Sequence, residues 1–296
     1  MRAGAGGLKR TAMLERELEP LLDGLAFGEA PRWHGERLVF SDIADHAVKA
    51  LTPDGRIETV VELGERRPSG LGWLPDGRLL IVSMRDHKLL RLDPGQLTEV
   101  ADISAYCGGH ANDMVVDAEG RAYIGNLGCD YEAANVEFHP THIVRVDPDG
   151  SVSAVARRVL CPNGMVISED GRTLIAAESP AGRLTAFDIA ADGSLSGRRV
   201  FAELPKKVMP DGICLDTEAA IWVASPTTKE FLRVHEGGRI SERITAPRSA
   251  IACMLGGEDR RTLFAITCGR RPHEAAAARD GHIGTVRVDC PGAGLP

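Results

Sequence analysis

The sequence predicts an all-β fold, a six-bladed β-propeller with four strands in each blade and an N-terminal strand that closes the ring in the last blade. Three observations lead to this prediction. A motif recurs six times along the 296 residues, at intervals of 40 to 51 residues. In the later part of the units, apolar residues alternate with other residues before a turn that contains glycine. No segment has apolar residues that repeat with the helical period of 3.6 residues. Repeats of this length with short strands are typical of propeller blades.

The recurring motif begins with a small or polar residue, continues through an apolar stretch and a turn with Asp and Gly, and ends in a second apolar stretch. Four copies span residues 69–83, 112–125, 163–176 and 211–224, the last without the turn glycine. Two weaker copies complete the set, and they begin at Glu29 and Ala252. Each copy predicts the first two strands of one blade, joined by a turn.

The outer strands of the blades follow in each interval. Residues 48–51, 89–92 and 142–146 are short strand-like runs that lead into turns containing glycine, which is a hairpin signal. A parallel α/β sheet is the competing fold, and it needs helical crossovers between its strands. The alanine-rich insertion at residues 270–279 has only short helical character, so the sequence offers no such crossovers.

The last unit ends near Val288 without a fourth strand. We therefore expect residues 17–25 to supply the outermost strand of the sixth blade and to close the ring. The resulting division of the chain has three parts. Residues 1–16 form a flexible N-terminal extension, residues 17–290 form a single propeller domain, and residues 291–296 form a C-terminal tail.

Composition limits the partners and the location. The 35 Lys and Arg residues against 42 Asp and Glu give a net charge of −7, and no basic block stands out, which argues against nucleic-acid or membrane partners. The first ten residues lack the apolar stretch of a secretion signal.

The seven cysteines are scattered, as expected of reduced thiols in a cytoplasmic protein. Because ring closure protects strand edges, we expect a monomer or a weak homo-oligomer.

The residue that opens the first strand of each blade lies near one mouth of the central channel, so six equivalent positions form a ring. These positions are Glu29, Ser69, Asn112, Asn163, Asp211 and Ala252. For any single Asn or Asp, ordinary turn chemistry is the alternative explanation. Four oxygen-bearing side chains together favour a cation, because converging carboxylates repel one another without one. Such hard ligands suit calcium, and magnesium, manganese and zinc remain open.

Short motifs at these positions carry a family resemblance. They are Gly-Glu-Ala-Pro-Arg-Trp at residues 28–33, Asn112-Asp113, Pro162-Asn163-Gly164, Pro210-Asp211-Gly212, and Gly256-Gly257 before Leu263-Phe264. Between about residues 20 and 290 the sequence resembles the senescence marker protein/gluconolactonase/luciferin-regenerating-enzyme family of six-bladed propellers. The resemblance implies a metal-dependent hydrolase, in most members a lactonase. It also implies one divalent cation held by Glu29, Asn163 and Asp211, with Asn112 as a companion.

The resemblance also indicates where a substrate lies. Sugar-lactone members commonly place an Arg two residues before the companion Asn, whereas this chain has His110, which favours a less sugar-like, more apolar lactone. A Glu that some members use for the substrate corresponds to the region of Asp130. That region belongs to the long segment 128–141, and long loops in compact domains are typical of lids or binding loops. The expected substrate contacts are His110, Asn112, Asp130, Tyr131 and Phe138.

Together, the ring and the resemblance predict a metal-dependent lactonase that opens a cyclic ester. A divalent cation would polarise the lactone carbonyl and stabilise the oxyanion during attack by water. Asp211 is the expected base for that water. His110 is the alternative acid or base, because an imidazole titrates near pH 6.5, although an exposed rim histidine is an equal interpretation. Two other functions remain open: phosphotriester hydrolysis at the same cation, and a non-catalytic metal- or ligand-binding propeller.

Overall fold

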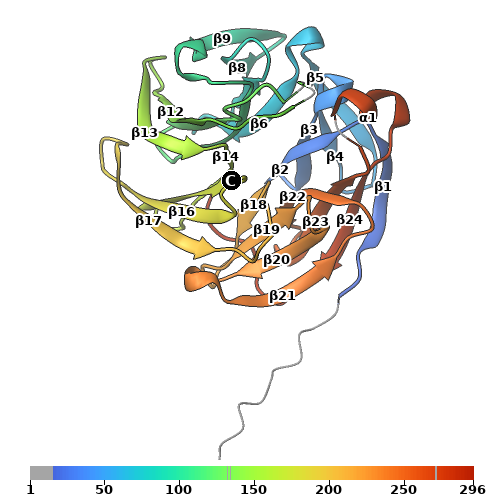
Figure 1. Cartoon of the computed structure of the whole chain (residues 1–296). Helices are drawn as coiled ribbons and strands as arrows, with labels where there is room; N and C mark the ends of the chain where they lie inside the picture. The colour runs from blue at the N-terminus through green and yellow to red at the C-terminus, as the bar shows by residue number, and fades with distance from the viewer. Residues whose placement is uncertain (1–15, 132, 134, 271) are drawn as a thin grey trace, which may run out of the picture.

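The structure is a computed structural model that describes residues 16–131, 133, 135–270 and 272–296. Within these residues the strands form six antiparallel four-stranded sheets around a central channel (Figure 1). From the innermost strand outwards, the blades are β2 (Gly28–His34), β3 (Arg37–Asp42), β4 (Ala47–Leu51) and β5 (Ile57–Glu62); β6 (Pro68–Trp73), β7 (Leu79–Ser83), β8 (Lys88–Asp93) and β9 (Gln96–Asp102); β10 (Ala111–Val116), β11 (Ala122–Asn126), β12 (Pro140–Val146) and β13 (Val152–Leu160); β14 (Pro162–Ile167), β15 (Thr173–Glu178), β16 (Arg183–Ile189) and β17 (Leu195–Glu203); β18 (Ile213–Leu215), β19 (Ile221–Ser225), β20 (Glu230–Val234) and β21 (Ile240–Thr245); β22 (Ser249–Gly256), β23 (Thr262–Cys268), β24 (Gly281–Arg287) and β1 (Glu19–Leu25). The described helical segments are α1 (Pro272–Ala278) and the 3-10 turns η1 (Ile43–Asp45), η2 (Gly64–Arg66), η3 (Ser104–Tyr106) and η4 (Glu236–Gly238).

The ring closes in the sixth blade, as the sequence predicts. β1 pairs antiparallel with β24, and Leu25 lies opposite Gly281. β1 is the outermost strand of its sheet, and most of its residues are exposed. Because β1 comes from the N-terminal part of the chain and β22 to β24 come from the C-terminal part, this pairing fastens the two ends together. The predicted fold class is confirmed.

The innermost strands are irregular at the ring positions. Among the described strands, five of the six first-to-second strand pairs carry a register shift at or beside the ring residue. The shifts lie between Glu29 and Arg32, Pro68 and Leu71, Ala111 and Met114, Pro162 and Met165, and Ala250 and Ala252. A bulge bends a strand and re-aims the side chain beside it. Five of the innermost strands are therefore bent at or beside the ring position.

A glycine follows ring residues Ser69 and Asn163, where neighbouring blades approach each other closely. A Cβ atom on Gly70 would lie 2.5 Å from the backbone nitrogen of Met114 in the next blade. A Cβ atom on Gly164 would lie 2.6 Å from the backbone nitrogen of Ile213. Both distances are shorter than side-chain carbons tolerate. The repeated glycine of the motif thus marks backbone packed against backbone around the channel.

The hydrophobic core lies between the blades. Each sheet packs between two neighbours, so the second strands are buried on both faces, as in β7 and β19, whose residues are all buried. The outermost strands β5 and β17 are mostly exposed. Trp222 of β19 and Phe40 of β3 are among the largest fully buried side chains. Most of the apolar side chains are therefore buried between the blades.

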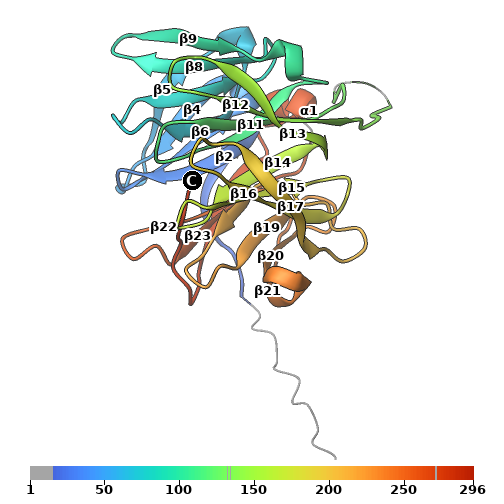
Figure 2. The same cartoon turned by 90° about the vertical axis from the view of Figure 1, so that its left-hand side faces the viewer.

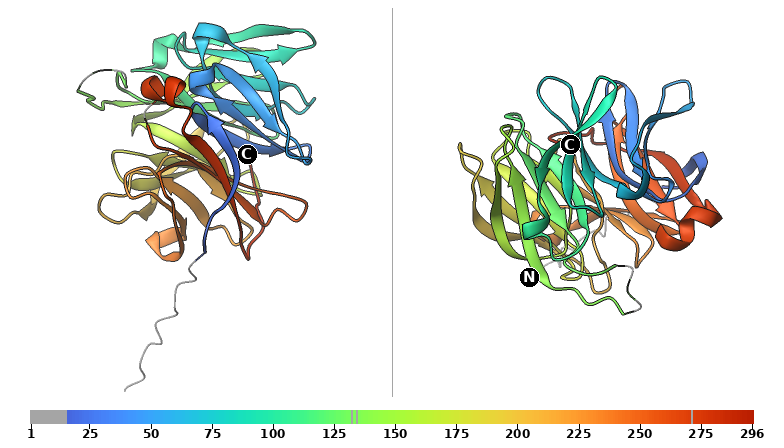
Figure 3. Two further views of the ribbon diagram at one scale, coloured as in Figure 1. Left: turned by 90° about the vertical axis from the view of Figure 1, so that its right-hand side faces the viewer. Right: turned by 90° about the horizontal axis from the view of Figure 1, so that it is seen from above.

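The two faces of the ring differ. α1 and the loop between β11 and β12 lie on one face, and the C-terminus lies on the opposite face (Figures 2 and 3), close to the channel axis in Figure 1. α1 forms in the alanine-rich insertion whose helical character the sequence indicates, and it contacts η1. No helix in the described part of the chain is both long enough and apolar enough to cross a bilayer.

The predicted N-terminal extension, residues 1–16, lies outside the described residues except for Arg16. Arg16 forms an ion pair with Glu242 of β21. At the other end, the predicted tail hydrogen-bonds with blades 4 and 5. Leu295 exchanges backbone hydrogen bonds with Ile167 of β14, at N–O distances of 2.8 and 3.0 Å. Both ends of the described chain are therefore attached to the propeller.

Candidate functional site

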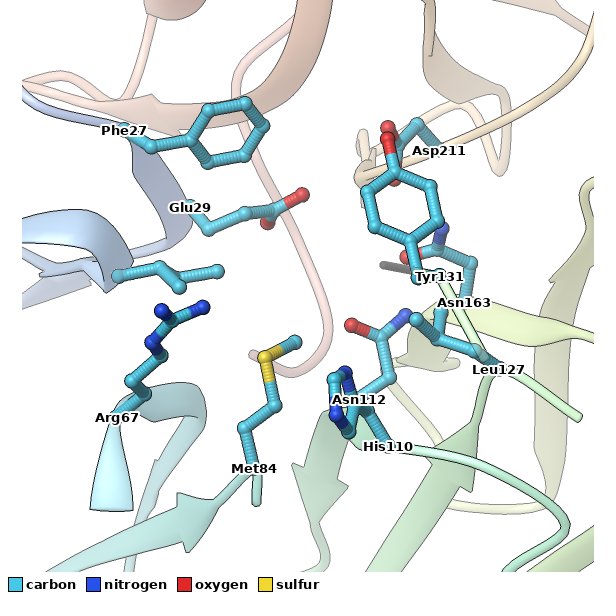
Figure 4. A pocket seen from close by; sticks show the side chains of 11 residues that line it. Phe27, Glu29, Arg67, Met84, His110, Asn112, Leu127, Tyr131, Asn163 and Asp211 are labelled. Atoms are coloured by element: carbon cyan, nitrogen blue, oxygen red, sulfur yellow. The ribbon is translucent and has the colours of Figure 1, made fainter. Parts of the chain in front are cut away.

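Four of the six ring positions meet in one cavity of about 90 Å³ at the channel mouth (Figure 4). Glu29, Asn112 and Asn163 line it and are more than nine-tenths buried, and Asp211 lines it with partial exposure. The site cavity, as we call it, is lined by Phe27, Glu29, Ile43, Arg67, Met84, His110, Asn112, Leu127, Tyr131, Asn163 and Asp211. Because η1 and the β11–β12 loop contribute to it, the cavity opens on the face that carries α1.

Hydrogen bonds hold the ring side chains in place. Glu29 Oε2 accepts the N–H of the following residue at 2.6 Å. Ser69 Oγ donates to Asn112 Oδ1 at 3.4 Å, and Asn163 Nδ2 donates to Ser179 Oγ at 3.3 Å. Asn112 Nδ2 is buried and has no hydrogen-bond partner among the described residues. Because buried polar atoms are normally paired, this amide nitrogen is available to a ligand.

The site cavity raises the pKa of both of its carboxyl groups. Burial is the largest cause for Glu29, and the negative charges of Asp211 and Asp113 add to it. Burial also raises the pKa of Asp211 to about 7, with hydrogen bonding to Asn163 opposing the shift and the charge of Asp113 adding to it. Asp113 itself is ion-paired with Arg32. Ionising two carboxyl groups in one buried cavity is unfavourable, and a bound cation would reduce that cost.

The structure brings two further predicted residues into the cavity and leaves two outside its lining. His110 and Tyr131 line the site cavity, and Figure 4 shows both side chains there. Asp130 is exposed and is not among the lining residues that the structure describes. Phe138 packs with Tyr131 on the apolar cluster around Leu127 and is not among the described lining residues. The β11–β12 loop therefore reaches the cavity through Leu127 and Tyr131.

Five residues that line the cavity were not predicted from the sequence, and all five occupy regular positions in the repeat. Phe27 and Arg67 each lie two residues before a ring position, as His110 does. These positions directly precede the first strands of their blades, and they form a second ring at the mouth. The other three directly follow the second strands of blades 1, 2 and 3, and they are Ile43, Met84 and Leu127.

Arg67 occupies a strained position in this second ring. Its backbone has φ 60° and ψ 119°, a region that residues with a Cβ rarely adopt and that costs about 1–3 kcal/mol. Its carbonyl accepts the N–H of Met84 at 2.9 Å, and its N–H donates to the Gly64 carbonyl at 3.3 Å. In Figure 4 the side chain enters the cavity from the wall opposite Asp211. Neighbouring backbone thus fixes the point from which the guanidinium enters.

The donor set fits a hard divalent cation. Glu29 and Asp211 supply carboxylate oxygens, Asn163 supplies an amide, and Asn112 lies beside them. Calcium takes carboxylate and amide oxygens, whereas structural zinc prefers Cys and His. The described residues contain no group of three or more His, Cys, Asp or Glu side chains placed to hold a metal ion. The set therefore reaches four oxygen donors only by including its two amides.

Two buried thiols near the cavity are not nucleophiles at neutral pH. Burial raises the pKa of Cys129 to about 11 and raises the pKa of Cys161 still further. Cysteine reacts as the thiolate, so a raised pKa suppresses its reactivity. All seven cysteines are free, and five of them are buried. The chemistry of the cavity therefore rests on its carboxyl, amide and imidazole groups.

Fold and site together define a six-bladed propeller with a carboxylate–amide site at the mouth of its channel. The family model described as "SMP-30/Gluconolactonase/LRE-like region" matches residues 27–269. The chain belongs to this family, which confirms the resemblance carried by the sequence motifs.

Individual relatives agree with this assignment. The chain is 31% identical over 172 residues to regucalcin from Danio rerio, and the match covers 57% of each chain, so it spans little more than half of that relative. It is 28% identical over 283 residues to 6-deoxy-6-sulfogluconolactonase from Pseudomonas putida, covering 91% of this chain and 94% of that protein. A crystal structure of a calcium-binding protein, regucalcin, from Agrobacterium tumefaciens matches with a TM-score of 0.78 at 22% identity, covering 95% and 97% of the two chains. This last likeness concerns the fold.

Proposed function

We propose that the protein is a lactone hydrolase that works in the site cavity with one divalent cation held by Glu29, Asn163 and Asp211. The observation that carries the proposal is the convergence of Glu29 and Asp211 in one cavity, where the pKa of each carboxyl is raised. Membership of the family and the similarity to a sulfogluconolactonase support the same reaction. The relatives favour neither phosphotriester hydrolysis nor a non-catalytic propeller.

Lactone hydrolysis needs stabilisation of the developing oxyanion and a group that takes a proton from the attacking water. When bound, the cation would polarise the carbonyl and stabilise the developing charge. Asn112 Nδ2, which lacks a partner among the described residues, would donate to a substrate oxygen. Asp211 and His110 are the two candidate bases in the lining. A cation on Asp211 would weaken it as a base, whereas His110 is not one of the proposed ligands.

We propose calcium as the cation. The donors are carboxylates and amides, which are the hard oxygen ligands that calcium takes in proteins. The structural relative from Agrobacterium tumefaciens is described as calcium-binding, which supports the same choice here. Magnesium, manganese and zinc are the alternatives, because oxygen ligands alone do not select strictly among divalent metals.

The lining favours a lactone that is less sugar-like. Phe27, Ile43, Met84 and Leu127 present apolar side chains, and Tyr131 adds an aromatic ring. Burying hydrocarbon against such walls is favourable, whereas burying hydroxyl groups without partners is costly. We propose that the ring of the substrate carries hydrocarbon where a sugar lactone carries hydroxyl groups.

We also propose that the protein is cytoplasmic and is a monomer or a weak homo-oligomer. Seven free cysteines support a reducing compartment. The closed ring protects strand edges that could otherwise pair between copies. Light scattering on the eluted protein checks the second point: a mass near 31.7 kDa supports the monomer, and a stable larger assembly at micromolar concentration contradicts it.

Acid release in a pH-stat tests the proposed reaction. The protein is stripped with chelator and reconstituted separately with calcium, magnesium, manganese and zinc, then offered aldono-, γ-, δ- and ε-lactones. We expect release that depends on added cation, highest with calcium and with alkyl-substituted rings. Circular dichroism confirms that stripped protein is folded. Folded protein that releases no acid with any lactone and any cation contradicts the proposal.

A further inference from the structure

Arg279, which directly follows α1, joins the two chain segments that supply one apolar wall of the site cavity. This wall consists of Phe27, which directly precedes β2, and Ile43, which opens η1. We infer that Arg279 is a positioning residue that fixes the Phe27–Ile43 wall, and that the protein selects lactones by the alkyl substituent that packs there. This inference rests on the proposed lactone hydrolysis and deepens it, because it assigns substrate selectivity to one wall and to the residue that holds it.

Hydrogen bonds at a buried carboxylate join the two segments of the wall. The Ile43 N–H donates to the Phe27 carbonyl at 2.9 Å. Asp42, which is fully buried, accepts the N–H of Phe27 at 2.7 Å and the N–H of Ala26 at 3.2 Å. Lys49 donates to the same carboxylate at 2.8 Å, and a buried charge needs such a partner. The wall is therefore held through its backbone as well as by apolar packing.

Arg279 spans the same two segments from the surface. Nη1 and Nη2 donate to the two carboxylate oxygens of Asp45, the last residue of η1, at 3.0 Å each. Nε donates to the Gly24 carbonyl, three residues before Phe27, at 3.2 Å. Lys49 also pairs with Asp45, so it connects this contact to the buried carboxylate. Isolated surface ion pairs contribute little, whereas two-donor geometry and networks of several charges are the exceptions. One guanidinium thus holds both segments that carry the wall.

The helix α1 places Arg279 beside η1. Among the described residues α1 is the only α-helix, and it contacts η1 on the blade 1 side of the ring (Figure 1). Ala275 of α1 is fully buried in the same apolar cluster as Phe27 and Ile43. The Arg279 N–H donates to the Ala275 carbonyl at 2.9 Å, so the anchored helix presents the guanidinium to Asp45. The insertion in blade 6 therefore braces a wall that belongs to blade 1.

A fixed wall lets an alkyl substituent contribute to affinity. In Figure 4 the Phe27 ring lies beside Glu29, across the cavity from Asp211. A lactone ring held between these two carboxyls has the Phe27–Ile43 wall beside it, and each methylene buried there raises the affinity about fourfold. If the wall is loose, binding must first order its side chains, which offsets part of that gain. Loss of Arg279 should therefore reduce the advantage of an alkyl-substituted lactone over the bare ring.

Two matched ligand pairs measure this advantage. The turnover pair is γ-butyrolactone and γ-hexalactone, which carries an additional ethyl group. The binding pair is cyclopentanone and 3-ethylcyclopentanone, ketones that have no ester bond to hydrolyse. We expect wild-type kcat/KM to favour γ-hexalactone by about 10- to 20-fold, since two carbon groups gain about fourfold each. Calorimetry should show the same preference in the affinities of the ketones.

Three variants assign the ethyl preference to Arg279. Arg279→Met should reduce it by about 2- to 10-fold, mainly through KM, because ordering one side chain at an interface has a cost of that size. Arg279→Lys keeps the charge but loses the two-donor geometry, so it should fall between wild type and Arg279→Met. Arg287→Met is the matched control, because Arg287 forms a similarly exposed two-donor pair with Asp259 and neither residue lines the cavity. It should leave the preference unchanged. Each preference is a ratio within one protein sample, so a lower folded fraction does not alter it.

Hydrogen exchange of the cation-free protein measures the wall without any substrate. The relevant amides are those of Phe27, Ile43 and His46, the last of which donates to the Ile43 carbonyl at 3.3 Å. We expect all three to exchange faster in Arg279→Met than in wild type, because local opening becomes easier. Exchange in Arg287→Met should keep the wild-type rate.

The outcomes separate this inference from the proposed function. An ethyl preference that survives Arg279→Met, an equal loss in Arg287→Met, a wild-type preference near one, or unchanged exchange of the three amides overturns the role of Arg279 while lactone hydrolysis stands. If Arg279→Met does not fold, Arg279→Lys decides, and a preference equal to that of wild type overturns the role. Absence of turnover with every lactone overturns the proposed function. The ketones and the exchange then decide: a ketone preference and amide protection that both decline in Arg279→Met uphold the role, and either one left unchanged overturns it.

Discussion

Arg32 of β2 reaches across the channel to Asp113 of β10, two blades away, and places Nη2 2.5 Å from Oδ1. Both side chains are more than nine-tenths buried. The guanidinium also donates to the Leu71 carbonyl at 3.0 Å and to the Met114 carbonyl at 2.8 Å. Arg32 lies three residues beyond Glu29 along β2, and its hydrogen bonds connect three blades.

Removal of Arg32 should destabilise the protein strongly. Arg32→Met leaves Asp113 buried without its counter-charge, and breaking a buried ion pair in this way costs about 3–5 kcal/mol. The double variant Arg32→Met/Asp113→Asn removes both charges and should recover part of that loss. Urea denaturation of cation-free protein gives the free energies of unfolding for the comparison.

The matched control for this prediction is Arg78→Met. Arg78 also pairs with an aspartate, Asp76, but both side chains are substantially exposed, so the loss should be much smaller. Equal destabilisation by Arg78→Met and Arg32→Met, or a double variant no more stable than Arg32→Met alone, contradicts the proposed role of the buried pair.

The stability of the cation-free protein should depend on the protonation of Asp211. Its pKa in the folded state is raised to about 7, whereas an unfolded Asp titrates near 4, so the folded state holds a proton that the unfolded chain releases. The free energy of unfolding therefore loses this contribution as pH rises from about 4 to about 7. Asp211→Asn removes this titrating group. The free energy of unfolding of the variant, minus that of wild type, should therefore be larger at pH 8 than at pH 5. Urea denaturation with chelator at both pH values measures the difference, and a difference that does not change with pH contradicts the raised pKa.

The ring assignment predicts which substitutions abolish turnover. Glu29→Gln, Asn163→Ala and Asp211→Ala each remove a proposed cation ligand. We expect each to lower kcat/KM by about 100- to 1000-fold or more, since losing one group that stabilises the transition state costs about 100- to 1000-fold. Ser69→Ala is the control, because Ser69 holds the same ring position without lining the cavity, and its loss should stay below about tenfold, the value of one hydrogen bond. Circular dichroism should keep its β-rich form throughout. Retained activity in all three ligand variants would show the ring assignment to be wrong.

His110 should contribute to proton transfer. His110→Gln keeps a polar side chain of similar size but removes the titrating imidazole, and general acid–base catalysis is worth about 100- to 10,000-fold. The pH–rate profile should lose the limb that the imidazole contributes. His34, which stacks on Trp73 away from the cavity, provides the control substitution His34→Gln. An unchanged profile in His110→Gln leaves Asp211 as the base.

The repeat made much of this architecture predictable. Glu29, Asn112, Asn163 and Asp211 share one motif position, and a propeller brings equivalent positions together, so sequence spacing was enough to gather them in one cavity. The missing fourth strand of the last unit likewise indicated the closing strand β1. The same register, two residues earlier, would have included Arg67, which was overlooked because only the ring position was compared.

Other parts of the site carry no repeat signal. The β11–β12 loop occurs in one blade, so its fold depends on local packing. The sequence could not distinguish Tyr131, which lines the cavity, from Phe138, which is not among the lining residues. The pairing of Arg32 with Asp113 joins residues of different blades at different motif positions, and no periodic pattern links them. The role of the Arg32–Asp113 pair stays a prediction that the variants at these two residues test.

The most direct test compares calcium-restored lactone hydrolysis in chelator-stripped wild type and in Asp211→Asn. Asp259→Asn, which neutralises an exposed carboxyl in the turn between β22 and β23, is the matched control. We predict that added calcium restores acid release in wild type and in Asp259→Asn, and restores none in Asp211→Asn. Calcium-independent release in the stripped wild type, or full restoration in Asp211→Asn, would contradict a cation-dependent lactone hydrolase at this site.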